Sequence, residues 1–440
     1  MKAIYAMGMK VGSAALSYLF LFSLSNTLDI GSLGLFLFAY TVFTVLVQVS
    51  KSGVDLVLIK AVTSRPSLSD VKGIFASNIL LILSVSAVCS AMFFGASSYG
   101  VFDVVDSNEK NLGFSLVLIA VVIISVIQVF GALFQSRYKV VAQYWAMNVG
   151  LMAFLSAGLG AFILLEEPLG FLEICILFLA CSLLVMISVL VVFYRQFGKE
   201  LAAESTSMEQ EKNSVFQTFK NNSPYIAAAL LTIFLQWMPN LLGGVFMTEE
   251  ELGGLGVSLR LSIASNFPFL AFAALAAPAM ARYLHADNVE GLRSSYLTYH
   301  AVSVSFASAV LIFFTVFSEF MLGMFGVHGY EDLLVLCTLS WWVRVAVGPV
   351  GTILMLSGNY RMAISSLLVS VVICSSVFVF GYPSLGVNAA GWALLAGSVQ
   401  LSLFNAIQAY RISGALYASP VYFYFGISSL FRKLLMKKYG

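Results

Sequence analysis

Five ionisable side chains fall within long apolar runs of this sequence, where a charge is costly. Arg344 lies near the middle of one run and Arg260 in the outer third of another; Lys51 and Asp55 stand four residues apart in a third, on one helical face, and Lys10 lies at the inner end of the first. Ionisable groups at membrane depth indicate function. Guanidinium groups bind phosphate bidentately, so this set would suit an anionic, diphosphate-bearing cargo.

Simpler interpretations exist for several of these charges. Lys51 and Asp55 either form an internal ion pair or leave one partner open to substrate or a proton, in which case Asp55 would gate or couple. Arg260 either snorkels or caps a carbonyl near the outer interface, or it faces a cavity. Lys10 either follows the preference for positive charge on the cytoplasmic side or contributes to the cavity. Arg344 is too deep to snorkel easily, which favours a role in a cavity.

Motifs of catalysis and of metal binding are missing from the sequence. The three histidines are far apart, and the five cysteines lie within apolar runs without zinc-ligand spacing. The sequence also has no phosphate loop, no nucleophile elbow and no basic patch interleaved with aromatic residues. The longest loop expected on the outer side of the membrane, 97–111, is too short for a catalytic domain. The sequence therefore predicts a protein that is not an enzyme, without catalytic residues, metal, cofactor or nucleic-acid partner.

The elements that position these charges are predicted from hydropathy. Hydrophobic residues make up 60% of the chain and charged residues 10%, with a mean hydropathy of +0.94. A soluble domain is closer to a quarter charged, so lipid must be the solvent. Helices of about 20 residues cross a bilayer, which predicts twelve spans: 8–28, 35–58, 73–95, 112–134, 142–164, 171–194, 224–246, 253–279, 297–318, 333–356, 362–381 and 386–410.

Basic residues alternate sides along these spans. The loops between consecutive spans can be numbered in chain order. Almost all of the 23 Lys and Arg fall at the N-terminus, in the even-numbered loops or in the C-terminal tail, whereas the odd-numbered loops carry acids and a single base, Lys110. Cationic loops stay in the cytoplasm during insertion. Both termini are therefore expected in the cytoplasm, and the first run is expected to be a retained span rather than a signal peptide.

The sequence divides near its middle. The long polar loop around 201–223 predicts a cytoplasmic linker between an N-terminal six-helix lobe, 1–200, and a C-terminal six-helix lobe, 224–410. A basic interfacial tail, 411–440, is expected to follow. The lobes resemble each other weakly: Leu33-Gly34 and Leu252-Gly253 open equivalent spans, about 219 residues apart. Two such repeats around a central cavity are a common transporter plan, and an even repeat places their axis along the membrane normal.

Several segments resemble the polysaccharide-transport family of flippases, within the multidrug/oligosaccharidyl-lipid/polysaccharide exporter superfamily. The similarity covers nearly the whole chain, but its motifs are diffuse. The segments that carry it are 250–261, with its glycines and Arg260-Leu261, 278–281, 287–292, Gly348-Pro349, 357–361 and 386–393. Of the candidate charges, only Arg260 matches by motif position.

The resemblance implies a twelve-helix, all-α integral membrane protein in two lobes around a central cavity. It also implies translocation of undecaprenyl-diphosphate-linked oligosaccharide, such as O-antigen repeat units, across the bacterial inner membrane. Membrane lipids, and the polymerase and chain-length proteins of glycan assembly, are the partners implied, and proton or sodium coupling is left open.

Two other functions compete with this one. A cation-coupled multidrug antiporter would need an acid in the cavity, and only Asp55 qualifies, since spans one and seven hold no acid. A membrane enzyme of polysaccharide assembly would need an outer catalytic loop, which the sequence lacks.

Overall fold

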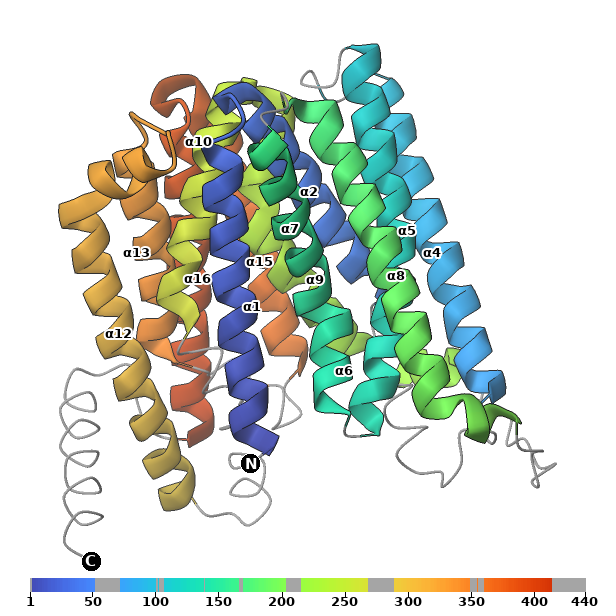
Figure 1. The fold of residues 1–440 in the computed structure, drawn as a ribbon. Helices are drawn as coiled ribbons and strands as arrows, with labels where there is room; N and C mark the ends of the chain where they lie inside the picture. Colours follow the sequence, from blue (N-terminus) through green and yellow to red (C-terminus); the bar gives the residue numbers. More distant parts are fainter. Residues whose placement is uncertain are drawn as a thin grey trace, which may run out of the picture. The chain divides into compact units, whose positions relative to one another are not determined.

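Every element of regular structure in the described part of the chain is a helix (Figure 1). The computed structural model describes residues 2–51, 72–99, 102, 107–137, 139–165, 169–202, 215–267, 289–348, 354 and 360–413. The helices are α1 (Lys2–Ser25), α2 (Ile30–Lys51), α4 (Lys72–Ser98), α5 (Asn108–Ser136), α6 (Val140–Tyr144), η3 (Trp145–Val149), α7 (Gly150–Leu165), α8 (Phe171–Ala202), α9 (Val215–Phe246), α10 (Glu249–Ser262), η4 (Ile263–Asn266), α12 (Val289–Met324), α13 (Glu331–Val347), α15 (Tyr360–Leu385) and α16 (Asn388–Ser413).

Most of these helices match the expected membrane spans. Nine helices of the described residues are long and apolar enough to cross a bilayer, and α1 adds a shorter apolar stretch, Gly12–Ser25. The spans expected at 35–58, 253–279 and 333–356 begin on α2, α10 and α13 and continue outside the described residues. The prediction of an all-α, twelve-helix membrane protein is confirmed.

The chain forms two compact units. Unit 1 comprises Met1–Leu230 and Gly243–Gly253, and unit 2 comprises Leu231–Leu242 and Gly254–Gly440, so α9 and α10 each contribute to both. The linker expected at 201–223 is described only in part, since residues 203–214 lie outside the described part of the chain and α9 begins at Val215. The expected basic tail lies outside the described residues from 414 onward.

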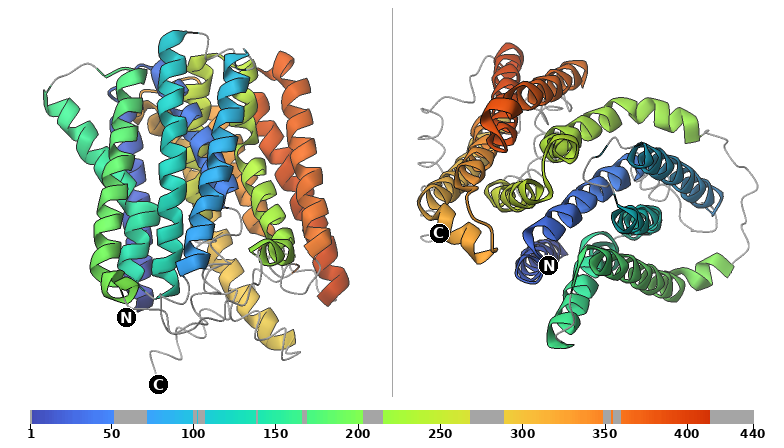
Figure 2. Two further views of the ribbon diagram at one scale, coloured as in Figure 1. Left: turned by 90° about the vertical axis from the view of Figure 1, so that its right-hand side faces the viewer. Right: turned by 90° about the horizontal axis from the view of Figure 1, so that it is seen from above.

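Equivalent helices pack in the same way within each unit. In unit 1, α5 packs against α4 and α8; in unit 2, α13 packs against α12 and α16. The second span of each half also makes equivalent contacts. In unit 1, α2 contacts α4 and α5; in unit 2, η4 contacts α12 and α13. The views in Figure 2 show α4, α5 and α8 running side by side. This agreement supports the internal repeat that the sequence predicts.

The first turns of α2 and α10 approach each other through two glycines, inside unit 1. A Cβ at Gly253 would lie 2.6 Å from the carbonyl oxygen of Ile30. A Cβ at Gly34 would overlap the carbonyl oxygen of Glu249 and lie 2.6 Å from the Gly253 amide nitrogen. The two approaches are reciprocal, because Ile30 and Glu249 are separated by the same 219 positions as the two glycines. The residues that mark the sequence repeat therefore form a pseudo-symmetric contact.

An ion pair lies beside this glycine contact. Lys110 Nζ, in the first turn of α5, is 2.5 Å from Glu249 Oε1, and the two side chains are 25% and 32% exposed. Lys110 is the one base that the sequence places on the acidic side of the membrane. Its pairing with an acid at the start of α10 gives this exception a structural reason.

Reversing this pair gives a testable result. We expect Lys110→Glu to lower the melting temperature of the detergent-purified protein, because it sets like charges against each other, and Glu249→Lys added to it to restore the loss. A double-mutant cycle should return a coupling of about 0.5–1 kcal/mol. Glu109→Lys, one residue away, is the matched control and should not rescue; equal rescue by either lysine would show that only net charge matters.

Proline has different effects in different spans. α9 continues through Pro239 without interruption. α10 tightens into the short 3₁₀ helix η4 shortly before Pro268, and α13 ends at Val347, before Gly348-Pro349. Gly348 has φ 76°, a left-handed conformation that side chains rarely adopt. Proline therefore follows the end of regular α-helix at α10 and α13, whereas α9 remains helical through Pro239.

Candidate functional site

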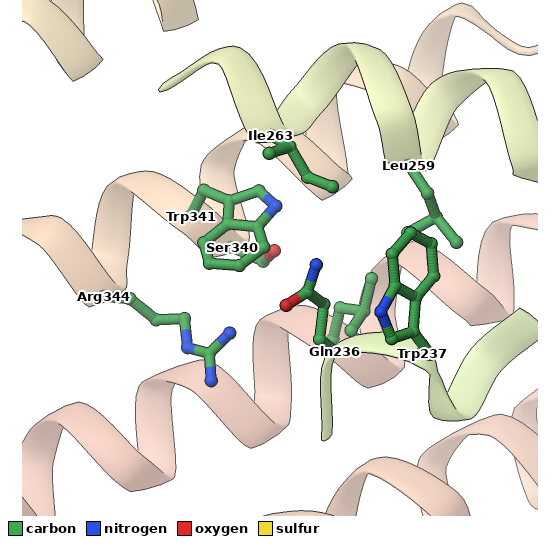
Figure 3. A pocket seen from close by; sticks show the side chains of 8 residues that line it. Gln236, Trp237, Leu259, Ile263, Ser340, Trp341 and Arg344 are labelled. Carbon is green, nitrogen blue, oxygen red and sulfur yellow. The ribbon is translucent and has the colours of Figure 1, made fainter. Parts of the chain in front are cut away.

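A small pocket within unit 2 gathers polar and aromatic side chains at membrane depth (Figure 3). Its empty volume is about 260 Å³, part of which is open to solvent. It is lined from α9, α10, η4, α13 and α16 by Gln236, Trp237, Leu259, Ile263, Ser340, Trp341, Arg344 and Leu394. The space that it encloses is about 10 Å³, which is room for roughly one water molecule.

Helix α13 presents Trp341 and Arg344 to the pocket because its other face is fixed. Trp342 packs with a buried apolar cluster formed by α12 and α13, and its indole Nε1 donates to Ser308 Oγ at 2.8 Å. On the α16 side, Ser402 Oγ donates to the Val343 carbonyl at 3.3 Å. Residues three apart lie on the same helical face. Trp341 and Arg344 are therefore held together on the face that lines the pocket.

Each of the two arginines stacks on a tryptophan of this pocket. The guanidinium carbon of Arg344 lies 4.9 Å from the ring centre of Trp341, and that of Arg260 lies 5.5 Å from the ring centre of Trp237. Arg260 Nη1 also donates to the Gly256 carbonyl at 2.9 Å. A cation over an aromatic face is stabilised and its plane is fixed. Stacking leaves the N–H edges of Arg344 available for a ligand.

The pocket lining is rich in hydrogen-bond donors that have no partner. Within the described part of the chain, the indole N–H groups of Trp237 and Trp341, the amide of Gln236 and the guanidinium of Arg344 make no hydrogen bond or ion pair. Figure 3 shows their nitrogen atoms turned toward the space between them. Among the described residues, no Asp or Glu belongs to the lining. Such a site favours a ligand with several oxygen atoms or a negative charge.

The residues singled out from the sequence do not all meet at this site. Arg344 lines the pocket, and Arg260 is one step removed, behind Trp237. Lys51 is the last described residue of α2 and Lys10 lies in α1; both belong to unit 1 and are no part of the lining. Asp55 lies outside the described residues, as does any pairing with Lys51.

Sequence reasoning did not assign the tryptophans, Gln236 or Ser340 to a site. The sequence carried a signal in Gln236-Trp237, where an amide stands beside an indole inside an apolar span. A second signal was Trp341 three residues before Arg344. Neither pair can be connected to the other without the packing of α9 near α13, across about 100 residues of sequence. Among the described residues no cluster of His, Cys, Asp or Glu could hold a metal ion.

Comparison with known families decides what kind of chain contains this pocket. A family model described as "Polysaccharide biosynthesis protein" matches residues 1–284, well over half of the 440 residues. The chain belongs to the polysaccharide biosynthesis protein family. The resemblance to polysaccharide-transport flippases inferred from its sequence is thereby confirmed at family level. Among curated proteins, none matches this family member significantly.

Solved structures with the same fold are transporters. An inward-facing multidrug resistance MATE family transporter of the MOP superfamily matches with a TM-score of 0.71 at 14% identity, over 96% of this chain and 100% of that one. The MATE multidrug transporter DinF-BH, solved as a complex, matches with 0.63 at 14%, over 93% and 94%. A MOP superfamily transporter from Pyrococcus furiosus, described by the reverse polarity of its binding pocket, matches with 0.63 at 13%, over 95% of each chain. This family member therefore has the MOP transporter fold and is a multi-pass membrane protein.

Proposed function

We propose that this protein translocates an undecaprenyl-diphosphate-linked oligosaccharide from the inner to the outer leaflet of the bacterial cytoplasmic membrane. Its cargo would be an O-antigen repeat unit or a similar surface glycan. The observation that carries the proposal is the pocket whose described lining holds Arg344 and unpartnered donors but no carboxylate. A diphosphate is an acceptor-rich dianion, so it matches that lining in charge and in hydrogen-bonding capacity.

Transport in this proposal follows alternating access. The sugar-diphosphate head leaves the cytoplasmic side and meets Arg344, while the polyprenyl tail stays in lipid. Arg260 supports the site through Trp237 and adds positive charge, and Lys10 and Lys51 attract the head from the cytoplasmic side. Asp55 couples the cycle to a proton or sodium gradient. Both termini are cytoplasmic, and the polymerase and chain-length proteins of glycan assembly receive the product.

A multidrug antiporter is the second candidate, because two of the structural relatives are described as multidrug transporters. A cationic drug needs a negative charge in its site, as opposite charges attract strongly at low dielectric. The lining of this pocket, as far as the structure describes it, holds a guanidinium and no acid. The pocket of the Pyrococcus furiosus transporter is likewise described by reverse polarity and a suggested different function. Charge therefore favours the anionic cargo.

Reconstitution separates these two functions. The purified full-length protein is placed in proteoliposomes with a fluorescent lipid-linked oligosaccharide in one set and a cationic dye in another. We expect the glycolipid to reach the opposite leaflet, measured by quenching from outside, and the dye not to move. Complementation of a strain lacking its flippase, scored for lipid-linked glycan trapped at the inner leaflet, tests the same function in cells. Transport of the dye without the glycolipid would overturn the proposal.

A further inference from the structure

A short hairpin from the second sequence repeat belongs to unit 1. It comprises Gly243–Gly253, the last turn of α9 and the first turn of α10, and the chain enters unit 2 on either side of it, at Leu242 and Gly254. Both helices run through these boundaries without a break, since α9 is helical to Phe246 and α10 is helical from Glu249. Large backbone changes are usually absorbed in loops and at the ends of elements. A displacement of unit 2 therefore pulls on the hairpin through two intact helices.

The hairpin contacts α2 at positions that have no side chain. A Cβ on Gly244 would overlap the ring of Phe38, and a Cβ on Gly253 would lie 2.6 Å from the Ile30 carbonyl oxygen. Small residues let helix backbones approach each other closely in a membrane. Dispersion attraction falls steeply with distance, so these contacts are lost together once the hairpin moves away.

Charge supplies a further attachment. Glu249, the first residue of α10, pairs with Lys110 on α5, and both side chains remain partly exposed. The same carboxylate lies beside α2, where a Cβ on Gly31 would be 3.4 Å from Glu249 Oε2 and 3.2 Å from Asp29 Oδ2. Two carboxylates therefore flank Gly31, and Lys110 offsets the charge of one of them. A partly exposed ion pair contributes little to stability, so water can replace it when the hairpin leaves.

We propose that the hairpin Gly243–Gly253 is a reversible clasp, which holds the outer ends of α2, α5 and α10 together in this structure and releases them when the outer side opens. The inference rests on the proposed function in one respect, namely that the protein works by alternating access; the identity of the cargo does not enter. The loops that precede these three helices are odd-numbered and acidic, which is why this end is expected on the outer side.

A disulfide across the clasp tests whether it must open. Gly31→Cys combined with Glu249→Cys would place the two Cβ atoms 3.7 Å apart, within the range of about 3.5–4.5 Å found in disulfides. The full-length double variant in proteoliposomes is oxidised with copper phenanthroline, and translocation of the fluorescent lipid-linked oligosaccharide is measured before and after reduction. We expect the oxidised protein to transport at least about tenfold more slowly and reduction to restore the rate. An unchanged rate in fully cross-linked protein would overturn the inference.

The single-cysteine variants and the wild type are the controls for this experiment. The wild type has five free cysteines, four of them buried. Its rate, and the rates of Gly31→Cys and Glu249→Cys alone, should not respond to the oxidant. Arrest of a single variant to the same extent as the double variant would show that the oxidant acts elsewhere, and the clasp would be wrong.

Labelling of the Gly31→Cys thiol reports on the clasp without any cargo. Gly31 is buried, and a side chain placed there lies against Glu249. A bulky, charged maleimide therefore reaches this thiol when the hairpin has moved away. In the detergent-purified protein we expect added Lys110→Ala to speed labelling about two- to fivefold, because the two carboxylates then face each other without the lysine. Lys139→Ala, at an exposed lysine before α6, is the matched control and should leave the labelling rate unchanged.

The two measurements separate this inference from the proposed function. If the glycolipid moves as fast with the clasp cross-linked, the function stands and the clasp is wrong. If the two alanine variants label alike, the ion pair does not hold the hairpin and the inference fails. If labelling responds to Lys110→Ala but the wild type moves no glycolipid, the clasp stands and the proposed function is wrong.

Discussion

Replacing Arg344 with alanine should reduce translocation of the lipid-linked oligosaccharide about 10- to 100-fold. Arg344 places the only cation in the described pocket lining, and its guanidinium edges have no partner in the described part of the chain. A charge-assisted hydrogen bond contributes about 1.5–3 kcal/mol, and 1.4 kcal/mol corresponds to a factor of ten. The initial rate in proteoliposomes and the display of surface glycan in cells both measure this effect.

Two further arginine variants make this experiment decisive. Arg344→Lys keeps the charge but loses the bidentate fork, so its rate should fall between those of the wild type and the alanine variant. Arg411→Ala removes an exposed arginine at the end of α16 and should transport normally. Each variant is first checked for membrane insertion and for a single peak in size-exclusion chromatography. A wild-type rate for inserted Arg344→Ala would rule out its role in binding the cargo.

Gly34→Ala should clearly destabilise the protein. Its new Cβ would overlap the backbone oxygen of Glu249, and a backbone atom of a helix cannot move aside as a side-chain end can. Overpacking of this kind typically costs about 1–3 kcal/mol. A lower melting temperature and a lower yield of folded protein are expected. Gly253→Ala should behave similarly, since its Cβ would meet the Ile30 oxygen at 2.6 Å.

Gly95→Ala is the control for this prediction. Gly95 lies within α4, and nothing lies within 4 Å of a Cβ placed there. Replacing a helical glycine by alanine without strain stabilises by about 0.4–1 kcal/mol. The control should therefore melt at or slightly above the wild-type temperature. If Gly34→Ala melts with it, the close approach of α2 and α10 does not contribute to stability.

The sequence predicts the helices well because their main determinant is local. A run of about 20 apolar residues must become helical in lipid, where each backbone polar group needs an internal partner. The basic residues and the weak repeat add the expected orientation and the division into halves. The repeat also marks Gly34 and Gly253 as equivalent, although it cannot show that they touch.

The pocket could be predicted only in part because it depends on contacts that are distant in sequence. Arg344 was recognised from its depth alone. Trp237 and Trp341 were not recognised, since aromatic residues make up 14% of the chain and occur in all spans. What distinguishes these two is that α9 and α13 bring their indole edges to one space, together with Gln236. The pairing of Lys110 with Glu249 is likewise a tertiary contact, which the charges of the individual loops do not reveal.

The reciprocal approach of Gly34 and Gly253 has a counterpart in symmetric dimers, where every contact across the axis occurs twice. The Ile30–Gly253 and Glu249–Gly34 approaches form such a pair within a single chain. Because each glycine has its own codon here, a substitution changes one approach and leaves the other in place.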